Sequence, residues 1–221
     1  SYNGNMSLFA GCSFKAGFCT YVFETCEQQK IDIDVTRLEY RDGMKNTGSG
    51  NLQYESYNTW WTIDYLENQC IQISDNTCYN VLRQKFTMAG FKAWLNRVGG
   101  QQTIWEPDVL YGSASSIERI NEWVAIYRYI TSGTDYANRL KHDLSVASPR
   151  FYDVGGPHKA GSSDNINYIC ASDCGIIYDW EGEPYIIAVI VQNGGNEFYS
   201  SQAVRKIANS IIYWANSNNV F

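Results

Sequence analysis

The chain has few histidines, no long apolar run and no cluster of basic residues. No stretch approaches the about 18 consecutive apolar residues that would span a bilayer, so no membrane insertion is expected. The 17 Lys and Arg residues are scattered and outnumbered by 23 Asp and Glu residues, which argues against a nucleic-acid-binding surface. His142 and His158 form no metal-binding pair, and no Cys-x-x-Cys motif is present. We therefore expect no metal and no other cofactor.

The composition is that of a folded protein with a sizeable core. Of the 221 residues, 44% are hydrophobic and 18% are charged, which are ordinary values for a globular domain. A chain of this length forms one domain or a domain of two lobes. The odd number of cysteines, 7, leaves at least one thiol unpaired if the others are oxidised. In a reducing compartment all of them would stay thiols.

Cys12 and Lys15 stand at positions i and i+3 of what reads as the start of a helix. Side chains at this spacing lie on the same helix face, so the Lys15 ammonium can reach the Cys12 thiol. The positive end of the helix also favours a thiolate at its first residue. Cys12 is therefore a candidate nucleophile, and the alternative is a buried cysteine that only packs in the core.

Two later motifs join Cys12 and Lys15 in an ordered set: Ser74-Asp75-Asn76, and Lys159-Ala160-Gly161 after a glycine-rich run. Read together as Cys-x-x-Lys, Ser-Asp-Asn and Lys-Ala-Gly, the chain resembles the penicillin-recognising serine hydrolases. These are the class A β-lactamases and D,D-peptidases, whose motifs are Ser-x-x-Lys, Ser-Asp-Asn and Lys-Thr-Gly. Each motif alone is weak, but the order and spacing of all three make the resemblance specific.

The resemblance covers nearly the whole chain and implies an α+β fold of two lobes, in which an antiparallel sheet meets an all-helical lobe, as in β-lactamases and transpeptidases. We expect one domain over residues 1–221, with the helical lobe at about 12–145 and the C-terminal strands and closing helix at about 150–221. Helices are predicted at 12–29, 62–73, 77–87, 90–96, 117–131, 136–144 and 203–215, and strands at 151–154, 168–180 and 185–192. Family members have a helix and one or two strands before the nucleophile. The N-terminal strands are therefore expected to be largely missing, and the chain looks like a trimmed fragment.

The resemblance also implies catalytic roles for four residues. Cys12 would attack a carbonyl and form a thioester, with Lys15 assisting its deprotonation. Ser74 would relay a proton to the leaving nitrogen. Lys159 would hold Ser74 and receive a substrate carboxylate.

The expected substrate-binding residues are Asn76, Ala160, Gly161 and Ser162. Asn76 would donate a hydrogen bond to the substrate amide, and the backbone amides of Cys12 and Ser162 resemble the family's oxyanion donors. Ala160 departs from the family, because it lacks the hydroxyl that Lys-Thr-Gly offers to a substrate carboxylate. This departure predicts weak recognition of β-lactams.

The nucleophile position is the larger departure, because the family has serine where this chain has Cys12. The cysteine fits either a native thiol acyltransferase or a substituted serine enzyme, and the sequence leaves both open. A thiol ionises far more readily than a hydroxyl, so attack by Cys12 depends less on Lys15 than attack by a serine would. A third alternative is a family member that has lost catalysis and keeps the cleft for binding.

Glu106, in Trp105-Glu106-Pro107, resembles the glutamate that activates the deacylating water in class A β-lactamases. The family continues with an asparagine where this chain has Leu110, and the loop that follows is shorter here. A shortened loop would misplace the carboxylate, so we interpret Glu106 as an ordinary loop residue. The alternative is a class A-like β-lactamase in which Glu106 is the deacylation base.

These features predict an acyl-transfer hydrolase or transpeptidase that acts on peptidoglycan-type peptides or β-lactam-like amides through an acyl-enzyme at Cys12. The expected partner is this small peptide or β-lactam-like substrate. Such a protein would be exported and work in the cell wall or outside the cell. Some class A enzymes have a disulfide between the nucleophile helix and the helix before Ser-Asp-Asn, so the resemblance also implies a Cys19–Cys70 bridge.

Overall fold

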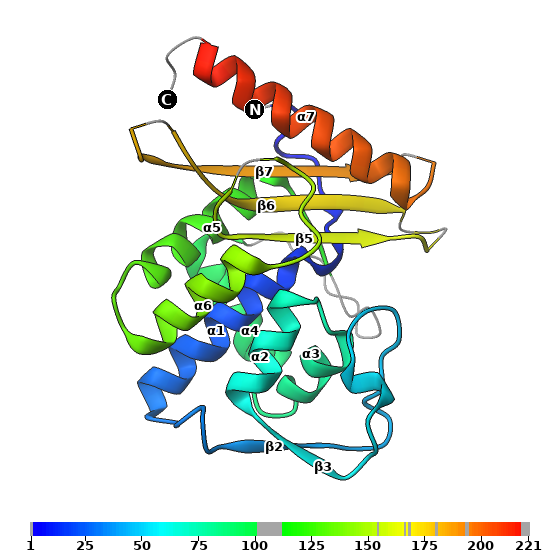
Figure 1. The fold of residues 1–221 in the computed structure, drawn as a ribbon, viewed down its shortest axis with the longest axis vertical. Helices are drawn as coiled ribbons and strands as arrows, with labels where there is room; N and C mark the ends of the chain where they lie inside the picture. The colour runs from blue at the N-terminus through cyan, green and yellow to red at the C-terminus, as the bar shows by residue number, and fades with distance from the viewer. Residues whose placement is uncertain are drawn as a thin grey trace.

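A computed structural model describes residues 2–100, 112–153, 155–165, 167, 169–179, 181–192 and 195–217. A three-stranded antiparallel sheet lies between a long C-terminal helix and a group of helices (Figure 1). The predicted α+β fold, an antiparallel sheet with an all-helical lobe, is confirmed.

The sheet contains β5 (His158–Ser163), β6 (Cys170–Tyr178) and β7 (Pro184–Gln192), in the order β5-β6-β7. Helix α7 (Glu197–Ser217) covers one face, and α5 (Ser116–Ile130) packs against β6 and β7 (Figure 1). The central strand β6 is covered on both faces and is buried over all but its last residue, so its sequence lacks the apolar and polar alternation of a half-exposed strand. One apolar core lies between the sheet and α7, and a larger one fills the helical lobe.

The helical lobe is built from six helices among the described residues. They are α1 (Phe14–Gln29), α2 (Ile63–Gln72), α3 (Asn76–Leu82), α4 (Met88–Val98), α5 (Ser116–Ile130) and α6 (Asp135–Val146). Helix α1 contacts α2, α4, α5 and α6, which explains why its sequence has no single apolar face.

Side-chain caps start most of these helices. The caps at Thr62, Asp75, Thr87, Ser115 and Thr134 each accept a hydrogen bond from the backbone N–H three residues later. At α5 the Glu118 side chain also accepts from the Ser115 backbone N–H at 2.7 Å, which completes a capping box. All of the predicted helices are present, with ends that shift by up to six residues: α3 ends at Leu82 and not at 87, and α7 begins at Glu197 and not at 203.

Two short antiparallel pairs complete the fold, β1 (Leu8–Phe9) with β4 (Ser113–Ala114) and β2 (Arg37–Tyr40) with β3 (Thr59–Thr62). Short 3₁₀ turns occupy Gly11–Ser13 (η1) and Leu52–Tyr54 (η2). The strand predicted at 151–154 is wrong for residues 151–153, which are irregular. The Phe151 N–H donates to the Asp173 side chain at 2.8 Å rather than to a neighbouring strand.

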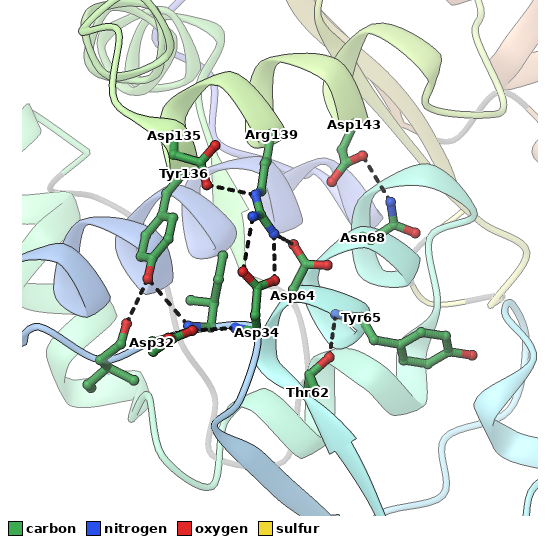
Figure 2. A network of polar contacts seen from close by, with 12 residues as sticks. Asp32, Asp34, Thr62, Asp64, Tyr65, Asn68, Asp135, Tyr136, Arg139 and Asp143 are labelled. Atoms are coloured by element: carbon green, nitrogen blue, oxygen red, sulfur yellow. Dashed lines mark hydrogen bonds and ion pairs between the residues drawn. The ribbon is translucent and has the colours of Figure 1, made fainter.

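Figure 2 shows how α6 is tied to the rest of the helical lobe by one arginine. The Arg139 guanidinium donates to Asp34 at 2.7 Å, to Asp64 at 3.0 Å and to Asp135 at 3.0 Å. Asp34 precedes β2 and Asp64 lies on α2, so the network joins three segments that are distant in the sequence. These contacts raise the pKa of Arg139 above its already high value.

The prediction of a disulfide is wrong. All 7 cysteines lie in the described part of the chain, and none is in a disulfide. Helix α1, which carries Cys19, does contact α2, which carries Cys70, but both cysteines are buried thiols. Burial raises the pKa of Cys19 well above its usual value, which disfavours the thiolate required for thiol–disulfide exchange.

None of the helices in the described segments has both the length and the apolar character needed to cross a membrane.

Candidate active site

Cys12 lies in η1, the turn that leads directly into α1, and its side chain is half-buried. The turn begins at Gly11, whose φ of +54 is in the left-handed region. Strand β5 packs closely against this turn: a Cβ on Gly161 would lie 2.4 Å from the Cys12 backbone nitrogen. Glycine is thus required at position 161 for the two backbones to approach.

Lys15 is fully buried one turn further along the helix start. Its ammonium donates to the Ser74 carbonyl at 2.5 Å, to Ser74 Oγ at 3.3 Å and to Asn76 Oδ1 at 2.7 Å. The Cys12 Sγ donates to the same Asn76 oxygen at 3.8 Å. The structure therefore brings together the first two motifs that the sequence singled out.

The loop of residues 46–52 crosses Ser74-Asp75-Asn76 and holds it. Ser74 has a left-handed φ of 59, and its carbonyl also accepts from Ser49 Oγ at 2.5 Å. The Asn76 Nδ2 donates to the Thr47 carbonyl at 3.0 Å. Asp75 does not face the site, because its carboxylate accepts from Leu52 N at 2.8 Å and caps α3. The middle residue of the motif therefore has a structural role.

Lys159 on β5 is also fully buried, and its Nζ donates to the Ala160 carbonyl at 3.1 Å. Burial lowers the pKa of Lys159 to about 8; a thiolate at Cys12 would raise it and the Lys15 charge lowers it further. The described residues contain no hydrogen bond from Lys159 to Ser74. Its predicted roles in holding Ser74 and binding a carboxylate stay predictions.

A cavity of about 660 Å³ opens where these elements meet. Six of the predicted site residues line this cavity: Cys12, Ser74, Asn76, Ala160, Gly161 and Ser162. Residues 46–49, Phe9, Ile73, Pro149, residues 163–165 and Glu197 complete the wall. Lys15 and Lys159 are not part of this wall and lie buried behind it.

The two predicted oxyanion donors come from the two sides of one backbone contact. The Cys12 N–H belongs to η1, and the Ser162 N–H belongs to β5, 3.0 Å from where a Cβ on Gly11 would lie. The Ser162 hydroxyl donates to Glu197 at the start of α7. Ser162 is thereby tied to α7 as well as to the sheet.

Three residues of this region were not predicted from the sequence. Ser49 and Glu197 are isolated in the sequence and carry no recognisable motif. His158, at the start of β5, is buried, with Nδ1 2.9 Å from Asp173 Oδ1 and Nε2 3.0 Å from the Ala147 carbonyl. Asp173, the third, was read only as part of a strand.

Glu106 lies outside the described residues. His142 is exposed on α6, away from the cavity that Cys12 lines. In the described ranges no group of three or more His, Cys, Asp or Glu side chains is arranged to hold a metal ion.

A thiol, a buried ammonium and a serine thus lie together at a cavity between the helical lobe and the antiparallel sheet. The model of the β-lactamase enzyme family, Beta-lactamase2, matches residues 1–215, and the chain belongs to this family. The fold and family are those of hydrolases. No curated protein sequence matches the chain.

Solved structures share the fold at low sequence identity. A β-lactamase from Chitinophaga pinensis superposes with a TM-score of 0.84 at 16% identity, covering 97% of this chain and 88% of its own. The TLA-1 extended-spectrum β-lactamase gives 0.82 at 16% identity, with coverage of 97% and 87%. PBP-A gives 0.79 at 18% identity, with coverage of 95% and 83%, and a mutant of PBP-A has been solved as an acyl-enzyme complex with penicillin G.

Proposed function

We propose that this protein is an acyl-transfer hydrolase or transpeptidase that forms a thioester at Cys12. The observation that carries the proposal is the contact set at the cavity. Cys12 Sγ and the Lys15 ammonium share Asn76 Oδ1, and Lys15 also reaches Ser74 Oγ at 3.3 Å. A nucleophile, a basic group and a hydroxyl thus lie within one hydrogen-bonded group.

In the first step the Cys12 sulfur attacks the carbonyl carbon of an amide or ester, and the C–S bond forms as the carbonyl oxygen becomes an oxyanion. The C–N or C–O bond then breaks, and the leaving group takes a proton. The route that the contacts support for this proton runs from the thiol through Lys15 and Ser74. In the second step water or an amine attacks the thioester and returns the thiol.

Substrate recognition follows from the same wall. The Cys12 and Ser162 backbone amides would stabilise the oxyanion, a role worth roughly 3–4 kcal/mol for each donor. The proposed substrate is a peptidoglycan-type peptide or a β-lactam-like amide. This substrate class leads us to propose that the protein works outside the cytoplasm or in the cell wall.

The test is intact-mass analysis after incubation with penicillin G and, separately, with a D-Ala-D-Ala peptide thioester. We expect the mass of one acyl group to be added to the parent protein and none to a Cys12→Ala variant. Cys12→Ser should be acylated by the same compounds if the site accepts either nucleophile. A Cys170→Ala variant is the matched control, because this second cysteine near the site is fully buried.

Two other outcomes would contradict a thioester at Cys12. Saturable binding of these compounds, with no added mass in the parent or in Cys12→Ser, would indicate a non-catalytic binding domain. Acylation that persists in Cys12→Ala would place the nucleophile elsewhere and refute the proposal.

A further inference from the structure

An arginine and a glutamate are fully buried on the face of α5 that packs against α1 and β6. Arg119 is 0% exposed and Glu122 is 1% exposed, and the two form an ion pair one turn apart. Removing two charges from water is costly, and the mutual attraction of a pair often fails to offset this cost. Stability alone therefore does not explain why the pair is buried here.

Arg119 has two further contacts at the base of the nucleophile turn. Its Nη2 donates to the Ser13 carbonyl at 2.8 Å, and its guanidinium lies over the Phe14 ring, 4.5 Å from the ring centre. Ser13 directly follows Cys12, and Phe14 is the first residue of α1. One guanidinium thus holds the backbone next to the nucleophile, and it is not among the residues that line the cavity.

The other side of the turn is held by the sheet. The Ala10 carbonyl accepts from Ser13 Oγ at 2.8 Å and from Ser172 Oγ on β6 at 2.6 Å. On β5, Gly161 lies so near the turn that a Cβ there would be 2.4 Å from the Cys12 nitrogen and 2.5 Å from the Ser13 nitrogen. The orientation of the Cys12 thiol and N–H therefore depends on a turn held between the sheet and Arg119.

Glu122 keeps Arg119 in place, and α1 is shaped to admit it. A Cβ on Gly17 would lie 1.9 Å from Glu122 Oε1, so only glycine leaves room for this carboxylate. Glycine is unfavourable in a helix interior relative to alanine. The space that the Glu122 carboxylate needs explains why glycine occupies position 17. Burial raises the pKa of Glu122 to about 7 even though Arg119 lowers it.

We propose that Arg119, oriented by Glu122, is a positioning residue for Cys12 that fixes the Ser13 carbonyl and the first turn of α1. The inference rests on the proposed role of Cys12. It assigns no contact with substrate to either member of the pair.

The proposal includes a dependence on pH, because protonation of Glu122 removes the counter-charge of Arg119. The groups that face Glu122 are Arg119 and Glu118 on α5, the Gly17 backbone on α1 and the Cys174 thiol on β6. Burial raises the pKa of Cys174 to about 11, so this thiol stays protonated near neutral pH. A change near pH 7 in the reactivity of Cys12 that depends on Glu122 is therefore expected.

The decisive variant replaces both charges at once, Arg119→Met with Glu122→Met. Replacing a buried ion pair by apolar side chains of similar volume often leaves a fold as stable as before. We expect the melting temperature to stay within about 5 °C, which corresponds to a small change in stability. Alkylation of Cys12 by iodoacetamide, followed by peptide mass mapping, should slow by about 10–100-fold, because a displaced turn takes the thiol away from the helix start and from Lys15, which favour the reactive thiolate.

Arg139→Met is the matched control. Its arginine also joins three segments through carboxylates (Figure 2), but it lies on α6 and lines a different cavity. This variant should leave alkylation of Cys12 unchanged. Arg119→Lys keeps the charge but loses the planar fork of donors, so it should restore only part of the rate.

The proposal is overturned if the double variant folds and its alkylation rate stays within about twofold of the parental rate. A difference of that size is what unrelated substitutions produce. If the double variant does not fold, Glu122→Gln decides by its pH profile. We expect the parental profile to contain a step near pH 7 that is absent from Glu122→Gln, and an unchanged profile overturns the proposal. Alkylation at Cys12 without acylation in the parent would refute the proposed function and leave this test in force.

Discussion

Replacing Lys159 by methionine should stabilise the protein near neutral pH, by an amount that depends on pH. The ammonium is fully buried on β5, and burial lowers its pKa from 10.5 to about 8. The fold therefore disfavours the charged form, and this penalty is fully present below pH 8. It disappears as the pH rises from about 8 to 10.5, because the unfolded chain then loses the same proton.

The size of the effect follows from this difference in pKa. One pKa unit corresponds to about 1.4 kcal/mol, so the difference between 10.5 and about 8 gives about 3 kcal/mol. Methionine has a similar length and no charge, so Lys159→Met removes the penalty without leaving a large cavity. The free energy of unfolding of the variant should exceed that of the parent by up to about 3 kcal/mol at pH 7, less any loss of the hydrogen bond to Ala160.

The assay is urea unfolding of parent and variant at intervals from pH 7 to pH 10.5, with the difference between the two free energies plotted against pH. Tyrosines and other lysines titrate in both proteins, so their contributions cancel in the difference. Lys92→Met, at an exposed position on α4, is the control and should show no such slope. A difference for Lys159→Met that stays constant from pH 7 to pH 10.5 would refute the reasoning, because it would mean that the ammonium is not desolvated in the fold.

Three further substitutions test the site. Gly161→Ala would put a Cβ 2.4 Å from the Cys12 nitrogen, so β5 must move away from the turn. We expect the free energy of unfolding in urea to fall by about 1–3 kcal/mol and acylation to be lost. Parental values for both would contradict the packing described. Ala160→Thr restores the hydroxyl of the family motif. The ratio of the acylation rate with penicillin G to that with a neutral thioester should rise by up to about tenfold, the equivalent of one hydrogen bond. An unchanged ratio would show that no substrate carboxylate lies beside residue 160. Glu106→Gln should change the deacylation rate by less than about tenfold, whereas loss of a general base costs about 10²–10⁴-fold; a trapped acyl-enzyme in this variant alone would identify a β-lactamase.

Much of the helical lobe could be predicted from local signals. The Ser-x-x-Glu pattern from Ser115 to Glu118 predicts the start of a helix, and the structure contains this capping box. Such signals depend on residues three or four apart, which is why they survive without tertiary information. The motifs around Cys12, Ser74 and Lys159 were recognisable for a different reason, because each keeps its reactive residue types close together in sequence.

The features that escaped prediction depend on contacts between distant segments. Ser49 reaches the Ser74 carbonyl only because the loop that carries it folds back over α3. Arg119 reads as an ordinary surface residue of an amphipathic helix, yet it is fully buried, because α1 and β6 cover that face of α5. The expected disulfide failed for a different reason: the helices that carry Cys19 and Cys70 do contact each other, but proximity does not decide oxidation state.

The position of the nucleophile explains why buried polar groups concentrate around one short turn. The η1 turn lies where the helical lobe meets the sheet, so no single element can satisfy its backbone groups. The Ala10 carbonyl is satisfied from β6 and the Ser13 carbonyl from α5, while β5 approaches the Cys12 nitrogen through a glycine. Because these contacts come from separate elements, a change in the packing of either lobe is transmitted to the thiol. The reactivity of Cys12 should therefore respond to substitutions in α5 and β6 that touch neither the cavity nor the substrate, while substitutions of equal size in β2 and β3, at the far end of the helical lobe (Figure 1), should leave it unchanged.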